Sequence, residues 1–296
     1  MITYSISQAE MLSLQAAKRR SRMRKITQAA LTYVLLTAMA MVVLFPLIVL
    51  LSASLKPAAD IFAYPPRIIP RAFSLENYTG ALQRAPLGRY LLNSFLTASG
   101  ITIGQLFTAA LAAFAFARLN FPAKSALFWA VIATYMVPWE LTLIPNYLTI
   151  SGWRMLDTYW GLTLPFMAGA FGIFLLRQNF KQVPEEYFDA AKIDGATSVQ
   201  QLWHVALPLA RPAVGALALL TFLSGWNQYL WPLLATSSNT WRTAQIGLRF
   251  FLVDQEGSNY GFVAAGAIIV LAPTLIAFIA LQSAFVRGLA VGGVKG

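Results

Sequence analysis

Six long apolar stretches constrain this chain more than any other feature of its sequence. A helix needs about 20 predominantly apolar residues to cross a bilayer. The stretches that approach or exceed this length are residues 29–55, 90–117, 125–147, 159–176, 212–235 and 260–286. Only 11% of the residues are charged, whereas soluble domains carry about 25%. The sequence therefore predicts an all-α membrane protein with six transmembrane helices.

Internal prolines and one glycine pair indicate how these helices pack. The prolines within the stretches are Pro46, Pro138, Pro145, Pro165, Pro232 and Pro273. Neighbouring helices in a membrane bundle re-satisfy the backbone groups that a proline frees, so we expect kinked spans. Gly100 and Gly104 form a GxxxG pair in the second stretch. This spacing allows close helix contact, and we interpret it as bundle packing.

Lysine and arginine predict which side of the membrane each loop occupies. Six of them precede the first stretch, within a tail of residues 1–28: Lys18, Arg19, Arg20, Arg22, Arg24 and Lys25. Together with the loops on the same side, this tail gives 14 such residues against eight on the other side. Cytoplasmic segments carry the excess of lysine and arginine. Both termini are therefore predicted to be cytoplasmic, and the net charge of +11 needs no nucleic-acid partner.

The long hydrophilic segment 177–211 is then a cytoplasmic loop, and its first half predicts a short helix. Pro184 suits the first helical position. Glu185 and Glu186 complement the positive end of the helix dipole. Gly195 is placed to end the helix.

The second half of this loop predicts another helix. Thr197 and Gln200 have the spacing of a capping box, and Pro208 is expected to stop the helix. The first helix presents one face that carries Tyr187, Ala190, Ala191 and Asp194. Such a face suits the surface of another protein, and an interfacial helix that rests on lipid fits the pattern equally well.

The run Asp189-Ala190-Ala191, followed by Asp194-Gly195-Ala196 and later by Leu207-Pro208, resembles the EAA loop of ABC importer permeases. Asp189 stands where that motif has glutamate, and the charge is kept. In that family the loop is a coupling helix that docks in a groove on the ATPase subunit. The resemblance implies that residues 187–197 transmit nucleotide-driven motion. The residues implied in ATPase coupling are Tyr187, Asp189, Ala190, Ala191, Asp194, Gly195, Ala196 and Pro208.

Motifs at residues 113–122, 161–165, 225–232 and 292–296 look like the carbohydrate-uptake branch of these permeases. The resemblance implies the type I ABC importer permease fold in the bacterial inner membrane. The stretch around residues 226–232 looks most like the glycerol-3-phosphate permeases. The terminus looks like the maltose type, in which the tail reaches the ATPase interface. That likeness implies ATPase contacts for Gly292, Gly293 and Lys295.

The chain lacks the residues for ATP hydrolysis. A P-loop needs a glycine directly before its lysine, and no lysine here follows a glycine. The chain contains no cysteine and a single histidine, His204, so clustered thiolate or imidazole metal sites are excluded. We interpret His204 as a packing residue. We therefore expect no enzyme activity, no metal and no cofactor here, with ATP and magnesium bound by a partner ATPase.

Candidate pathway residues lie in the third and fifth stretches. Glu140 is the one acidic residue within a span, and intramembrane charges usually face a cavity or a partner. It is flanked by Trp139 and Asn146. Aromatic and amide side chains that suit sugar hydroxyls follow in the fifth stretch: Trp226, Asn227, Gln228 and Tyr229. Glu140 also fits a structural role near the outer interface, and Trp231 fits an interface anchor.

The sequence thus predicts one permease subunit of an ATP-driven, binding-protein-dependent importer for a sugar, glycoside or polyol-type solute. A second permease, two ATPase subunits, an external solute-binding protein and the lipid bilayer are the expected partners. No lysine or arginine lies deep in a span, which favours a neutral ligand. The alternative is a secondary transporter, although the inverted repeat that such proteins often carry is not evident.

Overall fold

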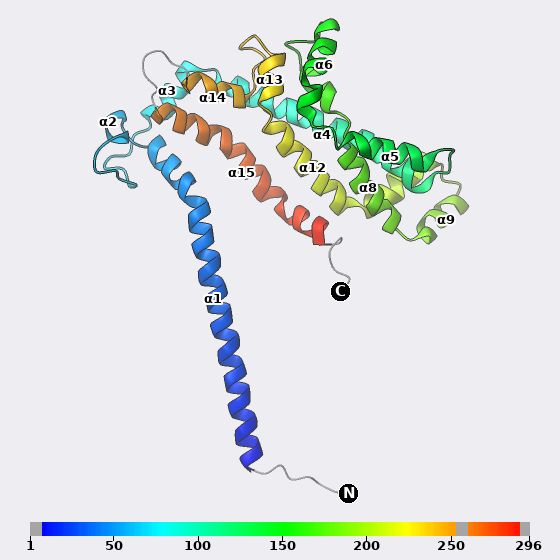
Figure 1. Ribbon diagram of the computed structural model, residues 1–296, viewed down its shortest axis with the longest axis horizontal. Helices are drawn as coiled ribbons and strands as arrows, with labels where there is room; N and C mark the ends of the chain where they lie inside the picture. Colours follow the sequence, from blue (N-terminus) through cyan, green and yellow to red (C-terminus); the bar gives the residue numbers. More distant parts are fainter. Residues whose placement is uncertain (1–7, 253–259, 291–296) are drawn as a thin grey trace.

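The computed structural model describes residues 8–252 and 260–290, and every regular element in these two ranges is helical (Figure 1). The long helices that carry the body are α1 (Gln8–Ser54), α4 (Leu87–Arg118), α8 (Ala170–Gln182), α12 (Arg211–Trp226) and α15 (Tyr260–Ala290). The helices at the end predicted to be external are α2 (Ala58–Ile61), α3 (Glu76–Arg84), α13 (Leu230–Ala235) and α14 (Ala244–Leu252).

Shorter helices fill the remainder of the described chain. Those between α4 and α8 are α5 (Lys124–Thr134), α6 (Trp139–Gly152), α7 (Tyr159–Thr163) and the 3-10 helix η1 (Leu164–Phe166). The predicted cytoplasmic loop holds α9 (Glu185–Ile193), α10 (Ser198–Gln201), the π-helical turn η2 (Leu202–Ala206) and α11 (Leu207–Leu209).

Two helices of the described chain are long and apolar enough to cross a membrane, the Met23–Ser54 part of α1 and the whole of α4. The number rises to five if each of three bent helix pairs is one span. The described apolar part of α15, Tyr260–Ile276, is shorter. The positions of the six spans in a bilayer therefore remain a prediction.

Three predicted spans are interrupted in the structure. The third is split between α5 and α6, which meet at 93°, and the fourth between the α7–η1 segment and α8, at 52°. The fifth stretch holds α12 and then α13, with a break at residues 227–229. α12 also forms a bent pair, at 84°, with the preceding segment Ser198–Leu209. Proline explains two breaks, because Pro138 caps α6 and Pro165 lies in η1, and neither can donate a backbone hydrogen bond.

The core lies where α4 packs against α8 and α12. One cluster of buried apolar side chains gathers at the predicted cytoplasmic end, from Ala109 and Phe114 of α4 to Leu176 and Phe180 of α8. The GxxxG pair packs as the sequence predicts, against the α7–η1 segment. A Cβ added at Gly100 would meet Thr163, and one added at Gly104 would meet Met167.

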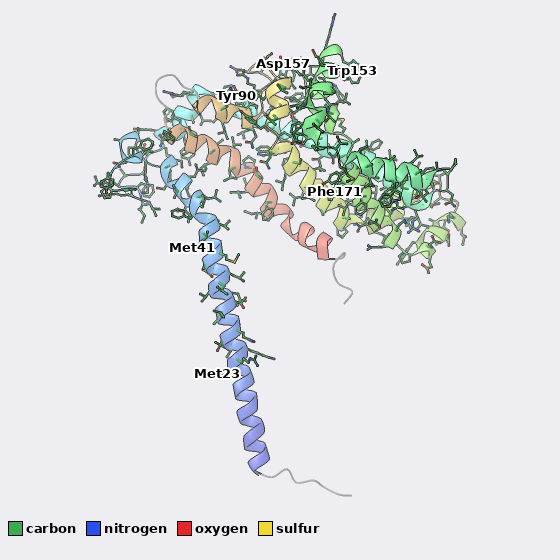
Figure 2. The ribbon with its side chains drawn as sticks, in the orientation of Figure 1. Met23, Met41, Tyr90, Trp153, Asp157 and Phe171 are labelled. Atoms are coloured by element: carbon green, nitrogen blue, oxygen red, sulfur yellow. The ribbon has the colours of Figure 1, made fainter. Side chains whose placement is uncertain are left out.

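Helix α1 leaves the body of the molecule (Figure 1). Its C-terminal end is held, because the Asn77 amide of α3 donates to the Ser54 carbonyl at 3.1 Å and α15 packs alongside. The most apolar 18 residues of its Met23–Ser54 part have no residue buried. Figure 2 places Met41 on this uncovered part. The helix also begins at Gln8, so most of the predicted tail 1–28 continues the span without a break.

Candidate functional site

The first helix of the predicted cytoplasmic loop, α9, has defined ends. Pro184 occupies the N-cap, one residue before its predicted position. At the other end Gly195 takes a left-handed φ of +79°. The Gly195 amide donates to the Lys192 carbonyl at 3.0 Å, and the Ala196 amide donates to the Ala191 carbonyl at 2.8 Å. This pattern is a Schellman motif, so the predicted glycine stop is confirmed.

The outer face of α9 presents the residues implied in ATPase coupling. Those that lie exposed are Tyr187, Asp189, Ala190, Asp194 and Gly195, while Ala191 and Ala196 are half-buried. Asp189 accepts from Lys192 at 2.8 Å, within the same helix. Ile193, which the sequence reasoning missed, is 87% exposed beside them. The small-residue face and the Ile193 side chain are thus both left uncovered by the rest of the chain.

The inner face of α9 is anchored to the bundle by Phe188. This ring is 3% exposed and lies 6.3 Å from the Phe114 ring of α4. A cavity of about 380 Å³ lies beside it, lined by residues of α4, α9 and α10 that include Arg118 and Gln201. The exposed helix is therefore coupled directly to the end of α4.

The second part of the loop begins as predicted but continues further. Thr197 and Gln200 form the expected capping box. The helical path passes through the π-turn η2 and ends at Leu209, one residue after Pro208, and α12 then leaves at 84°. The stop predicted at Pro208 is therefore found one residue later. His204 is exposed, with Nδ1 3.0 Å from the Gln200 carbonyl, and is not a packing residue.

At the other end of the bundle a pocket of about 550 Å³ brings together several predicted pathway residues. Trp139 of α6 lies there with Asn227, Gln228 and Tyr229 from the break after α12. The lining residues that sequence reasoning did not assign to the pathway are Gln105, Tyr135, Phe166, Ser224, Leu230 and Trp231. They lie on separate helices, and no single-sequence pattern links them. The lining contains no charged residue.

The remaining pathway candidates lie outside this lining. Trp226 is 2% exposed and stacks on Phe222. Glu140 is exposed in the first turn of α6, and Asn146 is half-buried further along that helix. Trp231 is buried and its Nε1 donates to the Gly161 carbonyl at 3.1 Å, so it is a packing residue and not an interface anchor.

Asp157, labelled in Figure 2, joins the segment before α7 to the segment after α13. Asp157 accepts from the amides of Ser237 and Ser238 at 2.9 and 3.2 Å. Partial burial alone would raise the pKa of this carboxyl. The hydrogen bonds from Ser237 and Ser238, with the nearby charge of Arg242, outweigh it and hold the pKa below its ordinary value.

Two further predictions, the ATPase contacts of the C-terminal tail and the absence of a metal, receive no structural test. Gly292, Gly293 and Lys295 of the tail lie outside the described residues. Among the described residues no group of three or more metal-ligating side chains comes together.

Comparison with known proteins gives one family and several close relatives. Residues 105–290, more than half of the chain, match the model of the binding-protein-dependent transport system inner membrane component. The sn-glycerol-3-phosphate transport system permease protein UgpE of Escherichia coli O1:K1 is 38% identical over 84% of this chain and 91% of its own. The UgpE of Yersinia enterocolitica is 37% identical over 87% of this chain and 94% of its own.

Solved structures give the same fold. A chain of a bacterial ABC transporter involved in the import of the acidic polysaccharide alginate matches with a TM-score of 0.77 at 24% identity. That match covers 95% of this chain and 99% of the other. A chain of a bacterial alginate ABC transporter in complex with an alginate pentasaccharide-bound periplasmic protein matches with a TM-score of 0.59 at 15% identity. It covers 92% of this chain and 99% of the other.

Proposed function

Because this chain belongs to the family of binding-protein-dependent transport inner membrane components, we propose that it works as one of two permeases in an ATP-driven importer. The chain is a transport permease of the inner membrane and not an enzyme. In the proposal two separate ATPase subunits supply the energy and bind ATP and magnesium. A periplasmic binding protein delivers the solute, and both termini of this chain lie in the cytoplasm.

The proposal of an ATPase partner rests on helix α9, which has two different faces. Its outer side offers small and uncovered side chains, whereas its inner side is fixed to the bundle through Phe188. A helix with this arrangement can receive a force from a neighbouring protein and pass it inward. The lipid-resting alternative fits less well, because Asp189, Lys192 and Asp194 place charges on the same exposed surface.

The solute of this importer is proposed to be a sugar, glycoside or polyol such as glycerol-3-phosphate. The relatives named UgpE support this class. The outer pocket supports it too, since tyrosine and tryptophan rings lie there with the amides of Gln105 and Asn227. Such groups suit carbon-bound hydroxyls. The lining has no positive charge, so in this proposal the partner permease supplies the cation that a phosphate needs.

A transport assay with the complete importer tests this proposal. Cells that carry the partner permease, the ATPase and the binding protein are compared with and without this chain. Uptake of labelled sn-glycerol-3-phosphate and of a maltooligosaccharide is measured. We expect uptake of one of them only with the chain present. Loss of uptake on ATP depletion, with uptake preserved under a proton ionophore, is the expected result. The reverse pattern would favour a secondary transporter.

A substitution on α9 tests whether this helix docks on the ATPase. Ala190→Glu adds bulk and charge to the exposed face of α9 and is expected to abolish uptake while the chain still inserts. Gln182→Glu adds the same charge at the end of α8 and serves as the control, with uptake retained. Uptake that is equal in the two variants contradicts the docking role of this face.

A further inference from the structure

The last residue of α4, Arg118, contacts two parts of the predicted cytoplasmic loop, the end of α8 and the helix α9. Its Nη2 donates to the carbonyl of Phe180 at 2.6 Å and to the carbonyl of Val183. Its guanidinium carbon lies 4.0 Å from the centre of the Phe188 ring. Its Nη1 lies 3.3 Å from a carboxylate oxygen of Glu185. One side chain thus joins α4 to the end of α8 and to α9.

These contacts of Arg118 differ in how much they stabilise the link between α4 and the loop. The Glu185 side chain is 84% exposed, and exposed ion pairs of this kind contribute little. The Arg118 side chain is 12% exposed, and the Phe188 ring beneath it is buried. The accepting carbonyls belong to the last turn of α8 and its cap, where a helix has unsatisfied acceptors and negative dipole character. The two bonds from Nη2 to these carbonyls and the contact with the Phe188 ring therefore dominate.

Helix α4 links this contact to the outer pocket. Gln105, on the same helix, lines the pocket and donates to the Phe166 carbonyl at 2.9 Å. Gln105 and Arg118 are thirteen positions apart, which is about 20 Å of unbroken helix. A displacement applied at Arg118 is therefore carried along α4 to the pocket wall.

We propose that Arg118 is the positioning residue through which movement of α9 reaches α4, so that the two helices move as one body. This inference rests on the proposed function, since it takes α9 as the helix that the ATPase moves. A guanidinium is needed because its Nη2 reaches both carbonyls while its planar face lies over the Phe188 ring. Lysine offers a point charge without this plane.

Arg177 of α8 gives a matched control. Its Nε donates to the Phe116 carbonyl at 3.2 Å, and its guanidinium carbon lies 3.8 Å from the centre of the Phe128 ring. It therefore makes the same two kinds of contact, a carbonyl bond and a ring contact. Its partners lie on α4 and α5 and not on α9. Removal of Arg177 takes away comparable packing but leaves the α9–α4 link in place.

The experiment uses the absence of cysteine in this chain. Leu230→Cys places a single thiol at the pocket lining. The whole importer is reconstituted in vesicles, and a maleimide label on this chain is measured with and without ATP plus vanadate. When Leu230→Cys is the only substitution, we expect ATP plus vanadate to change the rate at which the thiol is labelled. With Arg118→Ala we expect equal rates in both conditions, although ATP hydrolysis continues.

The other variants sharpen the result. Arg118→Lys is expected to behave as Arg118→Ala does, and it decides the question if the alanine variant fails to assemble. Arg177→Ala and Glu185→Gln are expected to keep the nucleotide response. A response that survives both Arg118 variants overturns the inference. A reporter that responds to nucleotide in no variant, including the one with Arg118 intact, counts instead against the proposed function.

Discussion

Gly195 combines a left-handed backbone with open space, which makes it a sharp probe of the α9 stop. A side chain added there would meet nothing of this chain within 4 Å, so within the chain a substitution acts through the backbone. A left-handed conformation costs about 1–2 kcal/mol for a residue with Cβ, and asparagine adopts it most readily. We expect Gly195→Val to reduce ATP-driven uptake strongly and Gly195→Asn to retain most of it. Equal uptake by the two variants would contradict a requirement for this turn.

Asp157 carries a prediction about pH. Its pKa in the folded protein is depressed below the ordinary 3.8, so its stabilising effect is present above that value. The effect is lost as the pH falls through the depressed pKa. Thermal unfolding of the purified chain is compared with that of Asp157→Asn. The native chain should be the more stable at about pH 7 and about pH 5, and the difference should shrink as the pH falls below about 4. A difference that disappears already at about pH 5 would contradict this assignment.

Single residues were predictable from the sequence where one local rule determines them. The Gly195 stop and the Thr197–Gln200 capping box depend only on neighbours within a few positions, and both are confirmed. Trp231 and His204 were assigned wrongly, because burial depends on distant segments. The Trp231 partner, Gly161, lies 70 positions away in the sequence.

At the scale of elements, α4 packs closely against its neighbours at positions where it has a glycine, such as Gly104. A Cβ at Gly104 would lie 2.5 Å from Cγ of Met167 and 3.2 Å from its Cα. Gly104→Ala should therefore destabilise the protein by about 1–3 kcal/mol through overpacking. Gly88 of the same helix has no neighbour within 4 Å, so Gly88→Ala should be neutral or slightly stabilising. Melting temperatures of both variants in detergent test this contrast, and similar losses would argue against it.

The sequence predicted the presence of these helices well, but it did not predict where they are interrupted. Apolar length reveals α4 and the described part of α15, since hydrophobicity alone determines them. The sequence predicted kinks at Pro138 and Pro165 but not breaks of 93° and 52°, because proline is tolerated inside many membrane helices. The outer pocket forms at such breaks, between α6 and the residues after α12. Its full lining was therefore beyond what an apolar pattern could reveal.

For the whole molecule, the two ends of the bundle are expected on opposite sides of the membrane. Single thiols are introduced at exposed positions, Gln83→Cys on α3 and Glu186→Cys on α9. In intact spheroplasts an impermeant maleimide should label the first and spare the second. In inside-out vesicles the pattern should reverse. Labelling of both from one side would contradict the predicted orientation.

The uncovered arm α1 has a consequence for its own angle to the bundle. A copy that has not met its partner carries an apolar helix without protein neighbours along most of its length. Lipid covers an apolar helix of this length, so the arm needs no protein neighbour to remain in the bilayer. Its angle to the bundle is then the feature that the proposed partner permease is left to determine.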